Sequence, residues 1–167
     1  MVNFRPPTLP TPYPELNGVL RHLVNSAGEV LGPDFVGAYL QGSFALGDFD
    51  EHSDCDFIVA TKGEPMDDHV AALQIMHGRI FDSGPEWAKH LEGSYFPRAI
   101  LRTKDHVGQR LWYLDNGSRQ LVRSDHCNQI HVRWILREKG VVLAGPPRIP
   151  SLIRSLHETC DMKSSKA

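Results

Sequence analysis

The sequence predicts an α+β fold, in which a small mixed β-sheet carries helices on one face. Three observations support this prediction. A chain of 167 residues with 41% hydrophobic and 23% charged residues is long enough for one domain with a substantial core. Helical periodicity alternates irregularly with short apolar runs that are bounded by turn residues. The resulting order, helix, strand, strand, helix, strand, hairpin and helix, is typical of an α+β or mixed α/β domain.

The chain divides into three parts. Residues 1–14 contain five prolines and are expected to form an extended Pro-rich arm. A single domain is expected over 15–157, with a core at 15–100 and an accessory hairpin and helix at 101–157. Residues 158–167 are expected to be a disordered tail.

The predicted elements follow from periodicity and from turn residues. Leucines and valines at helical spacing fill the segment before Gly32-Pro33, which stops the helix. Asp115-Asn116-Gly117 is a strong hairpin signal between two short apolar runs. The expected helices cover 14–31, 66–81, 125–139 and 151–156, with one helical turn at 43–46. The expected strands cover 35–40, 54–60, 88–95, 111–114, 120–122 and 141–143.

Composition limits the function. A net charge of −2 and the lack of a basic stripe with interleaved aromatics argue against nucleic acid as a partner and against template-directed polymerase activity. The apolar stretches are shorter than a membrane span requires, and no secretory signal is expected at the N-terminus, which lacks an apolar core region. Three cysteines without CxxC spacing suggest a cytoplasmic protein, and nine histidines without an HxH or HExxH pair argue against zinc.

The segment Gln41–Asp56, followed by an apolar run, is the main functional signal in the chain. Asp54 and Asp56 would share one face of a strand, roughly 7 Å apart along the chain, where two carboxylates can bind divalent cations. Gly42 would let the backbone approach a phosphate, and Ser43 offers a hydroxyl and an N–H. The segment therefore predicts a metal and phosphate site.

Other interpretations of this acidic segment are weaker. The aspartates could simply form a solvated acidic loop, which is the more common explanation of an isolated Asp-x-Asp. A calcium-binding EF-hand that starts at Asp48 would place Ser53 where glycine is needed and Val59 where a bidentate glutamate is needed. No Gly-Lys-Ser/Thr occurs, so a Walker A loop is absent.

Tyr39-Leu-Gln-Gly42-Ser43 with Ser53-Asp54-Cys-Asp56-Phe-Ile-Val resembles the signature of the DNA polymerase β-like nucleotidyltransferase superfamily. The chain is most similar to the aminoglycoside adenylyltransferase branch, the streptomycin/spectinomycin type, and its uncharacterised relatives. The resemblance implies a nucleotidyltransferase-like fold and transfer of AMP from ATP to a hydroxyl of a small molecule, with an aminoglycoside as one candidate.

The resemblance also implies roles for particular residues. Asp54 and Asp56 would bind Mg²⁺, with two ions expected, and Ser43 would hold a phosphate of ATP. A third carboxylate on a neighbouring strand would complete the metal site or act as general base. Glu92 is the candidate, and Asp82 is the alternative.

Two arginines are further candidates for the nucleotide. Arg133 and Arg137 follow His126 at spacings close to one helical face, from which they could reach a triphosphate. A solvated helix face explains the same spacing equally well. Arg102 and Lys104 have no motif to support them.

One departure from the family affects the acceptor. Drug-modifying relatives carry a C-terminal helical domain, whereas only about twenty residues follow Pro147 here. Either a second subunit of a homodimer builds the acceptor site, or the domain has been lost, or the chain is a shortened version. Two other functions stay open: an antitoxin that modifies or masks a partner protein, and a non-catalytic nucleotide-binding module.

Overall fold

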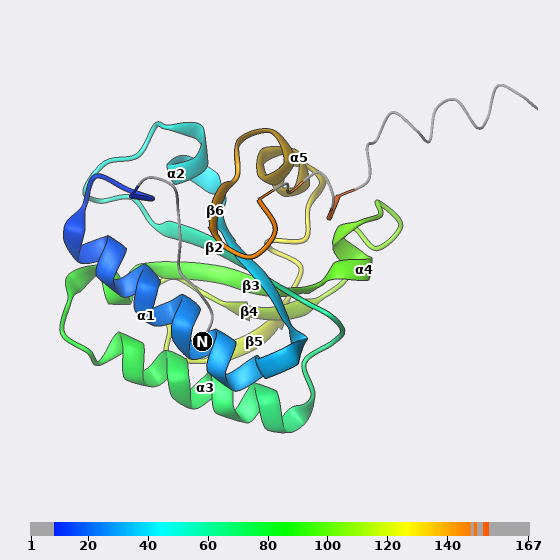
Figure 1. Ribbon diagram of the computed structural model, residues 1–167, viewed down its shortest axis with the longest axis horizontal. Helices are drawn as coiled ribbons and strands as arrows, with labels where there is room; N and C mark the ends of the chain where they lie inside the picture. The colour runs from blue at the N-terminus through cyan, green and yellow to red at the C-terminus, as the bar shows by residue number, and fades with distance from the viewer. Residues whose placement is uncertain (1–8, 148, 150–151, 154–167) are drawn as a thin grey trace, which may run out of the picture.

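The computed structural model describes residues 9–147, 149 and 152–153, and it is built around one six-stranded mixed sheet (Figure 1). The strand order is β5-β4-β3-β2-β1-β6, in which β2 and β3 are parallel and every other neighbouring pair is antiparallel. The predicted small mixed sheet is confirmed. The strands are β1 Phe35–Leu40, β2 Cys55–Thr61, β3 Leu91–Pro97, β4 Leu111–Leu114, β5 Leu121–Ser124 and β6 Val141–Ala144.

The two long helices lie side by side on one face of the sheet, as predicted (Figure 1). They are α1 Pro14–Leu31 and α3 Asp67–Phe81. The leucines and valines that gave α1 its periodicity belong to an apolar cluster that includes Phe57 and Val59 of β2, and all of them but Val30 are buried. Burial of this apolar stripe, rather than helix propensity alone, stabilises both helices.

The opposite face of the sheet is covered by two shorter helices, one at the end of the core segment and one in the accessory segment. α4 Arg98–Leu101 and α5 Ile130–Lys139 contribute to a second apolar cluster, which includes Ile58 of β2 and Phe96 of β3. Side chains alternate along a strand, so Asp56 and Glu92 share this second face. The prediction of helices on one face therefore holds for the long helices α1 and α3. Asp56 and Glu92 lie on the other face, which the accessory segment covers.

The accessory segment adds strands to both edges of the sheet. The β4–β5 hairpin pairs beside β3, and β6 pairs beside β1. The turn that begins at Asp115 joins β4 to β5, as the sequence predicts. α2 Gly42–Leu46 lies beside α5 (Figure 1), so the Gly-Ser turn faces the accessory helix.

Several element boundaries differ from the predictions, and hydrogen bonds explain two of the differences. A 3₁₀ turn at Glu86–Lys89 delays β3 to Leu91, because the His90 N–H bonds to the Trp87 carbonyl. α5 begins at Ile130 rather than at 125, because the Asn128 side chain is bound to the carbonyls of the 106–109 loop. β2 begins at Cys55, one residue later than expected, so Asp54 precedes the strand.

The ends of the chain are described only in part. Thr11 at the end of the Pro-rich arm is buried, and its hydroxyl donates to Asn17 Oδ1 at 2.7 Å. The arm is therefore attached to α1 at this point. The predicted tail at 158–167 lies outside the described residues. So does the helix predicted at 151–156, apart from Leu152 and Ile153, which are buried.

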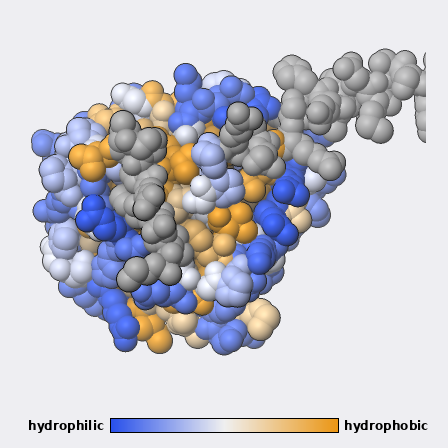
Figure 2. Space-filling view, in the orientation of Figure 1, coloured by the Kyte–Doolittle hydropathy of each residue, from blue (hydrophilic) through white to orange (hydrophobic). Residues whose placement is uncertain are grey.

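The surface in the orientation of Figure 1 has hydrophilic residues around its margin and hydrophobic residues nearer its centre (Figure 2). Among the described residues, no helix combines the length and the apolar character that crossing a membrane would require.

Candidate active site

Asp56 and Glu92 form the centre of the candidate site. They are register partners on the parallel strands β2 and β3, and both side chains lie on the face toward α5. Burial, then Glu92 and Asp54, raise the pKa of Asp56 to about 7. The structure thus places two of the predicted carboxylates side by side, and their mutual repulsion makes the site favourable for a cation.

Asp54 lies immediately before β2, close to Asp56. Its Oδ1 accepts a hydrogen bond of 2.8 Å from Asn116 Nδ2, which belongs to the turn between β4 and β5. Its charge contributes to the raised pKa of Asp56. All three predicted carboxylates are therefore brought into one electrostatic environment.

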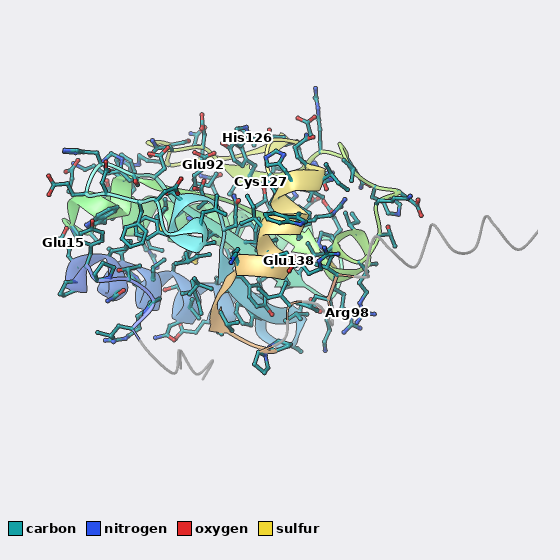
Figure 3. All side chains as sticks on the ribbon, turned by 90° about the horizontal axis from the view of Figure 1, so that it is seen from above. Glu15, Glu92, Arg98, His126, Cys127 and Glu138 are labelled. Atoms are coloured by element: carbon teal, nitrogen blue, oxygen red, sulfur yellow. The ribbon has the colours of Figure 1, made fainter. Side chains whose placement is uncertain are left out.

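Glu92 is almost buried, and two side chains contact its Oε1. The Tyr113 hydroxyl donates at 2.9 Å, and His126 Nε2 lies at 2.9 Å. Burial and the hydrogen bond to Glu92 raise the pKa of Tyr113, which keeps its proton available for donation. Figure 3 shows Glu92, His126 and Cys127 grouped together, at a distance from Arg98 and Glu138.

The Gly42–Ser43 turn approaches the carboxylates from the end of β1. The Gln41 N–H bonds to the Asp56 carbonyl at 2.9 Å, which fixes the turn beside β2. Gly42 has φ +63°, and a Cβ there would collide with the Asp56 carboxylate. Only glycine combines this backbone conformation with this close approach. Ser43 lies half-buried in the first turn of α2.

A pocket of about 470 Å³ opens between this turn and the accessory segment. Gly42 and Asp56 line one side, and the residues that precede and begin α5 line the other. Two carboxylates and two histidines line it, together with amide and apolar side chains, and none of its described lining residues is Lys or Arg. The lining is Gln41, Gly42, Asp56, Asp125, His126, Cys127, Gln129, His131, Val132 and Ile135.

The donor set determines which metal would suit this site. Within the described ranges, no three His, Cys, Asp or Glu side chains are gathered closely enough to form a ready-made metal cage. Carboxylate oxygens, however, are the ligands that Mg²⁺ prefers, usually one or two from the protein with the remainder from water and phosphate. A cation would also offset the repulsion that raises the pKa of Asp56. Asp54, Asp56 and Glu92 therefore fit Mg²⁺ by their chemistry.

The structure does not bring Arg133 to the carboxylates, which corrects the expectation that it reaches a triphosphate. Its side chain is buried, and Nη2 donates to the Ile100 carbonyl at 2.9 Å and to Asn128 Oδ1 at 2.8 Å. Burial lowers its pKa. Arg133 links α5 to α4 instead. Arg137, in the last turn of α5, donates to Glu138 at 2.7 Å.

Other candidates are also placed by the structure. Asp82, the alternative to Glu92, forms an ion pair with Arg119 at the end of α3. His126 lies in the turn before α5 rather than on its face. Sequence reasoning missed Tyr113 and Asn116 altogether. The Asp-Asn-Gly signal located their hairpin, but no local pattern indicated that it lies against the carboxylates.

These observations define an α+β protein with a nucleotidyltransferase-like fold and a carboxylate site at the ends of β2 and β3. The fold is similar to that of spectinomycin adenyltransferase AAD(9) from Enterococcus faecialis, solved with ATP and spectinomycin. The TM-score is 0.67 and the sequence identity is 12%, over 88% of this chain and 63% of that one. The chain thus spans under two thirds of that enzyme. No protein-family model and no curated protein matches the sequence.

Proposed function

We propose that this protein is a metal-dependent nucleotidyltransferase that transfers AMP from ATP to a hydroxyl of a small molecule. The pairing of Asp56 with Glu92 on adjacent parallel strands carries the proposal, because it joins the Asp-x-Asp segment to a third carboxylate. The Gly42 turn lies against the Asp56 carboxylate, and the pocket opens beside it. The similarity in fold to an adenyltransferase supports the same class of reaction.

The residues have distinct roles in this proposal. Asp54, Asp56 and Glu92 would hold Mg²⁺, which would neutralise charge on the phosphates of ATP. The Gly42–Ser43 turn would bind phosphate oxygens through its backbone and hydroxyl. In the reaction, the acceptor hydroxyl oxygen bonds to the α-phosphorus, the bond to the β-phosphate oxygen breaks, and pyrophosphate leaves. Glu92 would take the hydroxyl proton.

The acceptor is the less defined half of the reaction. The pocket contains carboxylates and amides, which suit a polyhydroxylated compound that is neutral or positively charged. An aminoglycoside meets this description, and the AAD(9) structure contains spectinomycin. Because this chain spans 63% of that enzyme, a second subunit of a homodimer is one way to complete the acceptor site.

Transfer of label tests the proposal. We would incubate the purified protein with Mg²⁺, ATP labelled in the α-phosphate, and a panel of aminoglycosides and other small polyols. Asp56→Asn removes one carboxylate of the pair, while Asp48→Asn removes a charge from the exposed acidic loop nearby. We expect a labelled acceptor with the wild type and with Asp48→Asn, and none with Asp56→Asn.

The other outcomes of this experiment are equally informative. When a cell extract is added to a parallel reaction, label on a protein, and on no small molecule, would replace the proposal with the antitoxin function. ATP binding without transfer to any acceptor would leave a non-catalytic nucleotide-binding module. Equal transfer by Asp56→Asn would contradict the proposed site.

A further inference from the structure

The strand β4 and the turn after it touch two of the three carboxylates from outside the Asp-x-Asp segment. Tyr113 on β4 donates to Glu92 Oε1 at 2.9 Å. Asn116 in the turn donates to Asp54 Oδ1 at 2.8 Å. One short part of the accessory segment thus contacts Glu92, near the start of β3, and Asp54, just before the start of β2.

This element is held in place by bonds of its own. The Gly117 N–H bonds to the Lys89 carbonyl at 3.0 Å, which attaches the turn to the residues before β3. Asp115 Oδ1 lies 3.0 Å from the Tyr113 hydroxyl, and the Asp115 carbonyl accepts from Ser118 N–H at 3.0 Å. The backbone of the turn is therefore fixed relative to β3.

The contacts favour one oxygen of each carboxylate. Among the described residues, both side chains that contact Glu92 lie on Oε1, and Asn116 contacts Asp54 through Oδ1. Glu92 Oε2 and Asp54 Oδ2 take part in none of these contacts. A carboxylate held by one oxygen loses rotational freedom about its terminal bond, which orients the other oxygen.

We propose that Tyr113 and Asn116 are positioning residues, which hold Glu92 and Asp54 so that Oε2 and Oδ2 are presented to a divalent cation. This inference rests on the metal site of the proposed function, but it assigns a role to a hairpin that lies outside the Gly-Ser and Asp-x-Asp motifs. Hydrogen bonds to metal-ligating carboxylates typically change metal affinity about 10- to 100-fold when they are removed.

Metal binding tests the inference without requiring turnover. Mn²⁺ serves as the probe, measured by electron paramagnetic resonance on the full chain with a non-hydrolysable ATP analogue. Tyr113→Phe keeps the buried ring and removes the hydroxyl, and Asn116→Ala removes the exposed amide. Ser118→Ala is the matched control, because among the described residues its hydroxyl bonds only to the backbone of Gln120. We expect Mn²⁺ affinity to fall about tenfold or more in the first two variants and to stay unchanged in the control.

A second measurement separates positioning from folding. The thermal unfolding temperature of each variant is recorded without metal, and Asn116→Ala decides the matter if Tyr113→Phe does not fold. Wild-type Mn²⁺ affinity in both variants would overturn the inference, and so would an equal loss in Ser118→Ala.

The outcomes also separate this inference from the proposed function. If the wild type binds Mn²⁺ and the analogue but transfers AMP to nothing, the proposed function fails while the positioning role stands on the variants. If the wild type transfers AMP and the variants bind Mn²⁺ normally, only the positioning role fails. A wild type that binds no Mn²⁺ overturns both.

Discussion

Asp56 and Glu92 are paired across the parallel strands β2 and β3, with both carboxylates on the face toward α5. Their situations are unequal. Glu92 receives a hydrogen bond from Tyr113 and lies against His126, whereas the pKa of Asp56 is raised to about 7 by burial and by the neighbouring charges. A bound cation would therefore stabilise the charged form of Asp56 most among these carboxylates.

The raised pKa predicts how stability depends on pH in the absence of metal. The pKa of Asp56 is about 7 in the folded protein and 3.8 for an unperturbed carboxyl. As pH rises through this interval the unfolded chain releases its proton first, so folding stability falls and stays lower above pH 7. We expect Asp56→Asn to unfold at a higher temperature than the wild type at pH 8, with a smaller difference at pH 5. A thermal melt with EDTA measures both, and a difference that does not change with pH would contradict the pKa assignment.

Removing the charge of Glu92 tests both of its proposed roles, as base and as metal ligand. Glu92→Gln keeps an acceptor oxygen for the Tyr113 hydroxyl but cannot accept a proton from a substrate hydroxyl. We expect kcat for AMP transfer to fall about 100-fold or more, and Mg²⁺-dependent binding of ATP to weaken as well, because Glu92 is also a proposed metal ligand. Steady-state kinetics together with direct binding of ATP make the comparison. A variant that keeps its kcat would exclude Glu92 as the base.

Gly42 is expected to tolerate no side chain. Gly42 and Gly47 both have positive φ, but only a Cβ at Gly42 would meet the Asp56 carboxylate. Gly47→Ala therefore controls for backbone strain alone, which costs of order 1 kcal/mol. We expect Gly42→Ala to lower the free energy of unfolding by more than Gly47→Ala, and to weaken ATP binding as well. Urea denaturation measures the first effect, and equal losses would show that the approach to Asp56 is not tight.

Arg133 is expected to affect folding rather than nucleotide binding. Its guanidinium is buried and bonds to Ile100 and Asn128, so its removal leaves two acceptors unpaired, while a methionine would still fill most of its volume. We expect Arg133→Met to leave the KM for ATP unchanged and to keep a folded protein, while Arg133→Ala lowers the unfolding temperature. A raised KM in Arg133→Met at an unchanged unfolding temperature would restore the phosphate role.

The sheet and its long helices could be predicted because local patterns determine them. The periodicity of α1, its stop at Gly32-Pro33, and the turn at Asp115-Asn116-Gly117 each depend on neighbouring residues. The strand that contains Glu92 was predicted as well. The position of Glu92 opposite Asp56, however, depends on the parallel register of β2 and β3, which no local pattern encodes.

The remaining parts of the site could not be predicted because they are long-range. The contact between Asn116 and Asp54 joins residues far apart in the sequence and requires the hairpin to lie beside β3. The spacing that suggested a role for Arg133 cannot distinguish the buried side of a helix from its exposed side. Arg133 lies on the buried side of α5, and the start of α5 at Ile130, after a turn held by Asn128, leaves His126 outside the helix.

Binding of ATP that requires Mg²⁺ at Asp56 is the most direct test of the proposed site. Isothermal titration calorimetry with a non-hydrolysable ATP analogue would compare the wild type with Asp56→Asn, each with Mg²⁺ and with EDTA. The account predicts binding by the wild type only when Mg²⁺ is present, and a loss of that binding in Asp56→Asn. Undetectable binding by the wild type, or equal binding by both proteins in EDTA, would contradict it.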